Sequence, residues 1–260
     1  MKKSENKVIN LFEQSNQGFQ KVVISESLKM KRGGSLLKPE LAYETWGKLS
    51  KKKDNVILIL TGLSANSHAA SNLKNSKPGW WEGVVGSGKA IDTDKFYVVC
   101  VNSLGSCFGS TGPASINQIT GEPYRLTFPE LTIDDMARAT KLLLEKLNIM
   151  EINTLIGPSM GGMHALALII QNKGYVKNFI GISTAAQSMP YAIAIRSLQR
   201  EVIRKDPLWE NGYYAPETPP LNGVRIARKL GMISYRSADE WAQRFGRKKS
   251  SKNTITQNTF

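Results

Sequence analysis

Four short aliphatic runs limit the fold of this chain more than any other feature of its sequence. They lie at Val56–Leu60, at Tyr97–Val101, at Thr154–Gly157 after Ile152, and at Phe179–Ile182. Continuous apolar runs of this length are typical of strands that are covered on both faces, as in a parallel sheet. Helical patterns lie between the later runs, over Thr132–Leu147 with Thr132 as N-cap, and over Met163–Ile170. This alternation predicts an α/β fold with a mostly parallel, doubly wound sheet.

The order of these patterns along the chain predicts its domain organisation. Residues 21–187 hold every predicted strand and form the expected core, in which Leu41–Trp46 alternates like a half-buried strand. Residues 188–246 contain two helical stretches, 190–206 and 222–246, separated by turn-forming prolines and glycines, and we interpret them as a helical cap. The polar stretches 1–20 and 247–260 are expected to be a flexible N-terminus and a polar tail.

Composition excludes some classes of protein and leaves others open. The net charge of +14 is spread along the chain without a nucleic-acid-binding module, so we interpret it as solvated surface charge that can also attract an anionic acyl carrier. No apolar run approaches the ~20 residues that a membrane helix needs. Only two cysteines occur and no secretory signal is visible, which favours a reducing, cytoplasmic location.

The segment Gly157-Pro158-Ser159-Met160-Gly161 matches the pattern G-x-S-x-G in the context that such a nucleophile needs. An aliphatic strand precedes the serine and an apolar helix follows it, so Ser159 is predicted to stand on a sharp strand-to-helix turn. The first amides of that helix point their positive dipole end at charge that develops near the serine. We therefore predict that Ser159 is a catalytic nucleophile for acyl transfer.

An acyl-transfer site also needs donors for the oxyanion and a base for the serine. The backbone N–H of Met160 is one predicted donor, and the loop that begins after Val56–Leu60 supplies the second, which we assign to Leu60. The two histidines, His68 and His164, both lie outside the chain order nucleophile, acid, histidine that this type of site uses. His164 is expected to pack locally, and Asp206 and Asp239 fall in the cap, so the triad is incomplete.

Blocks of sequence along residues 31–247 resemble the homoserine and serine O-acyltransferases of the α/β-hydrolase superfamily, and most closely the serine O-succinyltransferase branch. The blocks are Ala42-Tyr43-Glu44-Thr45-Trp46-Gly47, Leu60-Thr61-Gly62-Leu63-Ser64, Pro78-Gly79-Trp80-Trp81-Glu82, Asn102-Ser103-Leu104-Gly105-Ser106, Gly109-Ser110-Thr111-Gly112-Pro113, Pro123-Tyr124-Arg125, the elbow with Gly162-Met163, Ile195-Arg196-Ser197-Leu198-Gln199-Arg200, and Arg228-Lys229-Leu230-Gly231.

The resemblance implies an enzyme that moves a succinyl group from succinyl-CoA to the hydroxyl of L-serine or L-homoserine by a ping-pong route through Ser159. It implies that Arg200 binds the amino-acid substrate and that Gly62, Leu63, Ser64 and Ala65 help to select it. It further implies a role in cysteine or methionine biosynthesis and a homodimer formed through the cap. Acyl-CoA is expected as a co-substrate, with no metal, other cofactor, nucleic-acid partner or membrane.

Family members continue with further strands and with the triad aspartate and histidine, so the resemblance predicts a C-terminally truncated core without turnover of its own. Three alternatives remain open at this point. The donor and acceptor can be those of a homoserine O-acetyltransferase, the scaffold can serve a hydrolase or esterase, or the chain can be a non-catalytic remnant or binding module. A basic nucleic-acid binder is a fourth alternative, and it ranks last because no nucleic-acid-binding module supports it.

Overall fold

The computed structural model describes residues 18–246, which divide into two compact units after Gln187. The predicted flexible stretch over residues 1–20 falls outside the described residues except for its last three, and Gln20 already begins a strand. The predicted polar tail over residues 247–260 lies wholly outside them.

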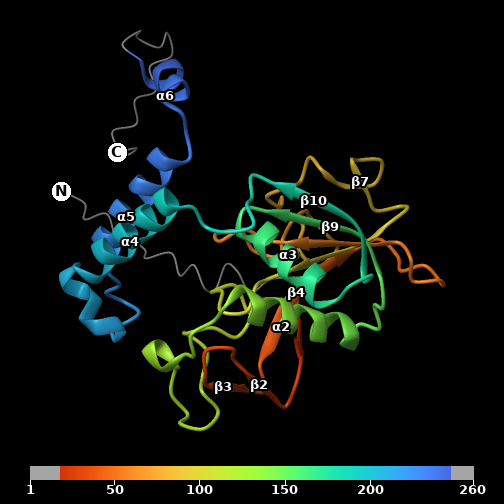
Figure 1. The fold of residues 1–260 in the computed structure, drawn as a ribbon, viewed down its shortest axis with the longest axis horizontal. Helices are drawn as coiled ribbons and strands as arrows, with labels where there is room; N and C mark the ends of the chain where they lie inside the picture. The colour runs from red at the N-terminus through yellow and green to blue at the C-terminus, as the bar shows by residue number, and fades with distance from the viewer. Residues whose placement is uncertain (1–17, 247–260) are drawn as a thin grey trace, which may run out of the picture. The chain divides into compact units, whose positions relative to one another are not determined.

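A six-stranded, mostly parallel sheet forms the centre of the first unit (Figure 1). Its strand order is β1 (Gln20–Val23), β4 (Glu40–Trp46), β8 (Tyr97–Val101), β5 (Val56–Leu60), β9 (Ile152–Pro158) and β10 (Val176–Ile182). The last four strands in this order pair in parallel, whereas β4 pairs antiparallel with both β1 and β8. The four aliphatic runs of the sequence are thus the four parallel strands, which confirms the predicted fold class.

Different kinds of structure cover the two faces of this sheet. On one face, α2 (Ile133–Lys146) and α3 (Met160–Gln171) pack their buried residues against Leu58, Val99 and Leu155. Thr132 caps α2 as predicted, because its side chain accepts from Asp135 N while the Asp135 carboxylate accepts from Thr132 N. On the other face, Ile59 and Cys100 pack against Ala69, Ala70 and Val85 of the connection from β5 to β8.

Short elements complete the first unit. They are β2 (Ser27–Lys29) paired with β3 (Ser35–Leu37), β6 (Val85–Gly86) paired with β7 (Ile91–Asp92), and the 3-10 turn η1 (Arg125–Thr127). Residues 61–96 hold only β6 and β7, so this long connection owes its path to side-chain contacts rather than to regular structure.

Strand β4 differs from the half-buried strand that the sequence predicts. Leu41, Ala42, Tyr43, Glu44 and Trp46 are all buried, because the β5–β8 connection covers the face that the alternation assigned to solvent. The prediction of a half-buried strand is therefore wrong, and Glu44 is a polar residue inside the protein.

Strand β10 lies at the edge of the sheet and is exposed along most of its length. Phe179, Ile180 and Ile182 are 37%, 48% and 39% exposed although the sequence of the strand is that of a buried one. An exposed apolar edge strand favours association with other chains.

We therefore expect the protein to self-associate as its concentration rises, and Ile180→Lys to reduce this association, because an edge charge opposes strand pairing. Light scattering over a concentration series measures the effect. Ile119→Lys, at an exposed residue (80%) that lies outside both the sheet and the helical unit, is the control. Equal association of both variants would contradict the edge as its cause.

The second unit is helical. It contains α4 (Pro190–Arg204), the 3-10 segment η2 (Pro207–Gly212), α5 (Leu221–Ser234) and α6 (Ala238–Phe245). The single stretch predicted over residues 222–246 is divided, because Ser237 accepts from Glu240 N and so begins a new helix. Asp206 ties α4 to α5, since its carboxylate accepts from Leu208 N at 3.0 Å and from Gly223 N at 2.7 Å. These two backbone donors lower the pKa of Asp206, and the Gly223 amide has the largest effect. The Asp206 carboxylate therefore has a structural role.

Candidate active site

Ser159 stands on a sharp turn between β9, which ends at Pro158, and α3, which begins at Met160. Its backbone has φ 54° and ψ −122°, a conformation that residues with a side chain rarely adopt. Surrounding groups hold this turn: Ser159 N donates to Ile182 O at 2.9 Å, and Ser159 O accepts from Gly162 N at 3.0 Å and from Thr184 Oγ1 at 2.7 Å. The backbone is thus tied down while the side chain is exposed, which is the presentation that an attacking hydroxyl requires.

The conformation of Ser159 predicts a conflict between stability and function. Its hydroxyl makes no capping hydrogen bond with α3, so its removal costs the helix nothing there. Ser159→Gly is expected to raise the free energy of unfolding by about 1 kcal/mol over Ser159→Ala, because only glycine adopts a φ of 54° without strain. Urea unfolding of the two variants measures the difference, and equal stability would show that the turn is unstrained.

The end of β5 lies directly against this turn. A Cβ placed on Gly62 would lie 3.8 Å from Ser159 Cβ, and the position of Gly161 faces the carbonyl oxygen of Leu60. Met160 is the first residue of α3, so its N–H is one of the free amides of the first turn. Gly62 thus lies beside the serine, and the oxyanion roles of Met160 and Leu60 stay predictions.

The loop residues assigned to substrate choice form an irregular turn. Leu63 is 60% exposed, Ser64 is exposed, and Gly62 and Ala65 are partly buried. They follow Thr61, which is buried at the end of the sheet. The segment is therefore accessible, and at Gly62 it lies close to Ser159 in space, while its role in selecting a substrate stays a prediction.

His164 is buried in the core and packs locally, as the sequence analysis expects. Its Nε2 lies 3.1 Å from Thr140 Oγ1, and the ring is fully enclosed between α3 and α2. Burial lowers its pKa to about 4, because charging the ring there would remove the imidazolium from water. His164 is consequently neutral in the folded protein at neutral pH.

This depressed pKa predicts acid sensitivity. In the unfolded chain His164 binds a proton below about pH 6.5, whereas the folded chain resists protonation until about pH 4. Acid therefore favours the unfolded state, and this group alone should lower the free energy of unfolding by about 2 kcal/mol between pH 7 and pH 5. Urea unfolding at the two pH values measures the loss, and His164→Asn should abolish this part of it. An unchanged pH dependence in the variant would contradict the assignment.

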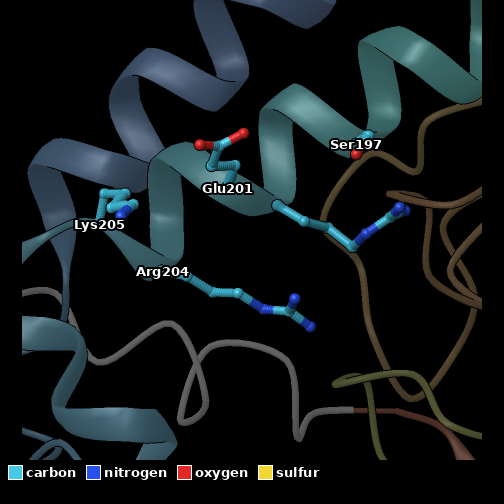
Figure 2. A pocket seen from close by; sticks show the side chains of 5 residues that line it. Ser197, Glu201, Arg204 and Lys205 are labelled. Carbon is cyan, nitrogen blue, oxygen red and sulfur yellow. The ribbon is translucent and has the colours of Figure 1, made fainter.

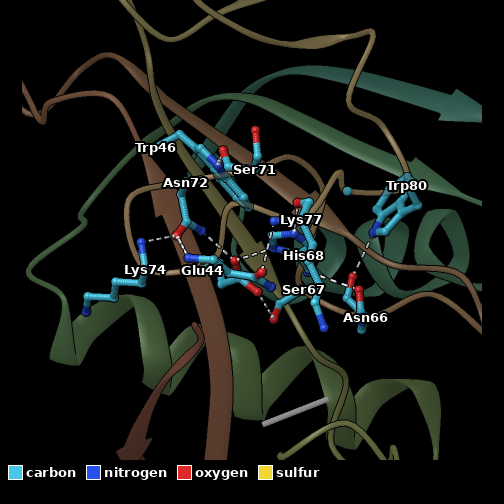
Figure 3. Close-up of polar contacts among 12 residues, drawn as sticks. Glu44, Trp46, Asn66, Ser67, His68, Ser71, Asn72, Lys74, Lys77 and Trp80 are labelled. Carbon is cyan, nitrogen blue, oxygen red and sulfur yellow. Dashed lines mark hydrogen bonds and ion pairs between the residues drawn. The ribbon is translucent and has the colours of Figure 1, made fainter. Parts of the chain in front are cut away.

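His68 lies in the β5–β8 connection, and its ring nitrogens contact residues other than Ser159. Its Nδ1 lies 2.9 Å from Glu44 Oε2 and its Nε2 lies 2.7 Å from Lys77 O, so both ring nitrogens have partners (Figure 3). Among residues 18–246, no side chain hydrogen-bonds the Ser159 hydroxyl. The described part of the chain thus brings Ser159 to the surface without a base beside it, and its role as a nucleophile stays a prediction.

Arg200 lies on α4 of the second unit and is exposed. It lines a pocket on this helix together with Ser197, Glu201, Arg204 and Lys205 (Figure 2). Its neighbour Arg196 is occupied, donating to Gln199 Oε1 and to Tyr235 OH at 2.7 Å each. Arg200 has no ion pair or side-chain hydrogen bond within the described ranges, so its guanidinium is available to an anion. Its role in substrate binding stays a prediction.

A buried polar cluster beneath the β5–β8 connection escaped the sequence analysis. Glu44, Ser67, Asn72 and Asn102 hydrogen-bond one another and His68 there. The one available signal was a glutamate inside a strand pattern, and the apparent alternation of that strand concealed it.

Residues 18–246 offer neither a metal site nor a membrane-spanning helix. In residues 18–246, no group of three or more histidine, cysteine or acidic side chains is arranged to hold a metal ion. In the same range, the helices are too short or too polar to cross a bilayer.

The sequence and the fold are both similar to those of known proteins. Serine O-succinyltransferase of Xanthomonas campestris pv. campestris (strain B100) is 58% identical over 220 residues, which cover 85% of this chain and 58% of that protein. Serine O-succinyltransferase of Stenotrophomonas maltophilia (strain K279a) is 57% identical over 217 residues, 84% of this chain and 59% of that protein. The chain thus spans less than two thirds of the length of these relatives.

Two solved structures share the fold at lower identity. Homoserine O-acetyltransferase from Bacillus anthracis superposes with a TM-score of 0.82 at 30% identity, over 91% of this chain and 65% of that one. Esterase E22 superposes with a TM-score of 0.79 at 34% identity, over 87% of this chain and 63% of that one. The family described as alpha/beta hydrolase fold matches residues 55–257, which include β5, the Ser159 turn and the second unit. The chain belongs to the alpha/beta hydrolase fold family.

Proposed function

We propose that this chain carries the nucleophile of an O-acyltransferase that moves a succinyl group from succinyl-CoA to the hydroxyl of L-serine, with L-homoserine as the alternative acceptor. The observation that carries the proposal is the exposed Ser159 hydroxyl on a strained strand-to-helix turn, in a chain 58% identical to a serine O-succinyltransferase. On the family resemblance, we also propose a role in cysteine or methionine biosynthesis. Two free cysteines fit a cytoplasmic setting, and a homodimer is the proposed assembly.

Each group has a definite task in the proposed reaction. The Ser159 oxygen attacks the thioester carbonyl, the coenzyme A thiolate leaves and takes up a proton, and a serine ester forms. The amides of Met160 and Leu60 donate to the oxyanion at this stage. The acceptor hydroxyl then attacks the ester, and Ser159 regains its proton. Arg200 binds the acceptor carboxylate through its planar guanidinium, and Gly62–Ala65 shape the space for the acceptor.

The same proposal assigns little turnover to these 260 residues by themselves. The Ser159 hydroxyl must lose its proton during attack, and an imidazole is the usual base. His164 is enclosed in the core, and both nitrogens of His68 have partners. The base would then come from sequence that corresponds to the additional length of the relatives.

A chimeric protein tests the function. It joins this chain to the part of the Xanthomonas campestris enzyme that continues past the matched segment. We expect it to form O-succinyl-L-serine from succinyl-CoA and L-serine, and the same chimera with Ser159→Ala to form none. L-Homoserine, acetyl-CoA and water, each offered in place of its counterpart, identify the true donor and acceptor. A chimera that folds but acylates none of these acceptors would refute the proposal.

Esterase activity on the same scaffold is the second candidate, because esterase E22 is 34% identical and superposes with a TM-score of 0.79. In that case water would accept the acyl group as readily as an amino acid does. A third reading, a non-catalytic remnant or binding module, draws on the absence of a base beside Ser159 in residues 18–246. Reaction of Ser159 with a fluorophosphonate in the chimera separates a working nucleophile from such a remnant.

A further inference from the structure

Glu44 of β4 is one of the buried side chains that attach the β5–β8 connection to the sheet, beside Trp46 and Asn102. Its Oε2 accepts from Asn72 Nδ2 at 2.7 Å and lies 2.9 Å from His68 Nδ1, while its Oε1 accepts from Ser67 Oγ at 3.3 Å. Figure 3 shows the three loop residues converging on this carboxyl group. Glu44 and His68 are only 2% and 9% exposed, and they line a small cavity of about 180 Å³ together with Ser67.

The partners of His68 limit its protonation state. Nε2 lies 2.7 Å from the carbonyl oxygen of Lys77, which can only accept, so Nε2 must carry a hydrogen. Nδ1 faces Glu44 Oε2. A neutral ring would then present its lone pair to the carboxyl group, and Glu44 would have to be protonated.

The other partners of Glu44 favour the ionised carboxylate. Asn72 Oδ1 accepts from the amides of Lys74 and Asn75, which orients its NH₂ group toward Glu44. Ser67 Oγ accepts from Asn102 Nδ2, which leaves the Ser67 hydroxyl hydrogen for Glu44. Two donors thus already point at the carboxyl oxygens, and hydrogen bonds of this kind stabilise the charged form. His68 Nδ1 must then donate as well.

The charge on Glu44 also affects Cys100, its neighbour on the adjacent strand. Cys100 of β8 is the Cα partner of Glu44 and is completely buried. Burial, and after it the negative charge of Glu44, raises the pKa of the Cys100 thiol. Lys77 contacts the His68 ring through its backbone carbonyl oxygen.

Ser67 and His68 lie a few residues along the connection from Gly62, which is close to Ser159 in space. The connection begins at Thr61, passes Gly62 against Ser159 Cβ, and reaches the fastened residues at Ser67 and His68. Trp80 strengthens the attachment, since its Nε1 donates to Asn66 O at 2.8 Å and its N donates to His68 O at 3.3 Å. The segment Thr61–Ala65 has no regular structure of its own and is held between the Ser159 turn and this attachment.

We infer that Glu44 and His68 form a buried carboxylate–imidazolium pair and act as positioning residues, which hold the Thr61–Ala65 segment in place beside Ser159. The pair itself is independent of the reaction, whereas its consequence for placing an acyl acceptor rests on the proposed function. Neither residue contacts Ser159, so their effect passes through the loop. The two measurements that test the pair use the 260-residue chain and require no turnover.

Nitrogen-15 NMR of the histidine rings tests the charge. The chain has two histidines, and the buried His164 serves as an internal neutral reference. At about pH 7.5 we expect one ring with both nitrogens protonated and one with a single protonated nitrogen. The signals are assigned with His164→Asn. A neutral pattern for His68 would overturn the proposed pair.

Hydrogen exchange tests the positioning. Glu44→Gln and His68→Gln each leave one buried charge without its partner, so we expect the hydrogen-bonded amides of His68, Ala69 and Trp80 to exchange at least about tenfold faster. The double variant has no such charge and can hydrogen-bond through its amides, so it should restore most of the protection, which loss of packing alone would not do. Asp92→Asn, which alters a carboxylate that binds the Gly88 and Asp94 amides of the same connection, is the matched control and should leave the amides of His68, Ala69 and Trp80 unchanged.

Amides of β9 report global stability, so the amides of His68, Ala69 and Trp80 must accelerate more than those of β9 in each single variant. Unchanged exchange in both single variants, or a double variant as unprotected as either single one, would overturn the positioning role. If His68→Gln fails to fold, the wild-type spectrum and the Glu44→Gln variant still decide the question. Because neither measurement involves a substrate, failure of the proposed function leaves their outcome unaffected.

Discussion

Mixed with succinyl-CoA and L-serine, the 260-residue chain is expected to form O-succinyl-L-serine about 10⁴-fold or more slowly than the Xanthomonas campestris relative does. The reason is the absence of a base beside the Ser159 hydroxyl in residues 18–246, since both nitrogens of His68 are engaged and His164 is buried. Release of coenzyme A, followed with a thiol reagent, measures donor cleavage, and mass spectrometry detects the ester product.

Ser159→Ala is the control for this expectation. If proton removal already limits the reaction, the variant and the parent chain should show nearly the same residual rate, because the nucleophile and its base act as a unit. Turnover comparable to that of the relative would refute the expectation, and would mean that a group outside the described residues or in a second chain serves Ser159.

Gly161→Ala is expected to destabilise the first unit by about 3 kcal/mol, with a fall of roughly 6 to 12 °C in the thermal midpoint. A Cβ on Gly161 would lie 1.9 Å from Leu60 O and 2.9 Å from Thr61 O, and both are backbone atoms of the sheet that cannot rotate away. Alanine improves helix propensity by at most about 1 kcal/mol, so the steric clash decides the sign.

The matched control for this substitution is Gly83→Ala in the β5–β8 connection, where a Cβ would meet no atom within 4 Å. Its stability should stay within about 0.5 kcal/mol of the parent chain. Urea and thermal unfolding measure both variants. Equal stability of the two would show that β5 and the Ser159 turn separate easily, which would weaken the case for a preorganised site.

The parallel strands could be predicted because a strand buried on both faces must be apolar at every position. The Ser159 turn could be predicted because its tight geometry leaves no room for side chains at the flanking glycines. A Cβ on Gly157, for example, would lie 2.5 Å from Gly161 O. Helix starts at Thr132 and Ser237 follow from side-chain capping, although only the first was predicted. These features depend on residues that are near one another in the chain.

Other parts of the site depend on residues far apart in the sequence and could not be predicted from it. Strand β4 alternates like an exposed strand, and only the return of residues 61–96 over that face buries Glu44. Glu44 and His68 are 24 positions apart, and no short-range pattern links them. The same holds for Thr184, which supports the Ser159 carbonyl from 25 residues away.

By itself the sequence determined the class of fold, the strand-to-helix turn at Ser159 and the order of the two histidines relative to that serine, because each can be recognised from local apolar patterns or from residue order. Only the tertiary structure decided that β4 is enclosed, that both ring nitrogens of His68 have partners, and that the loop beside Ser159 is fastened through Glu44. The burial of a residue and its hydrogen-bond partners depend on which distant segments of the chain come into contact. The pattern of a single sequence does not specify such contacts at the level of individual atoms.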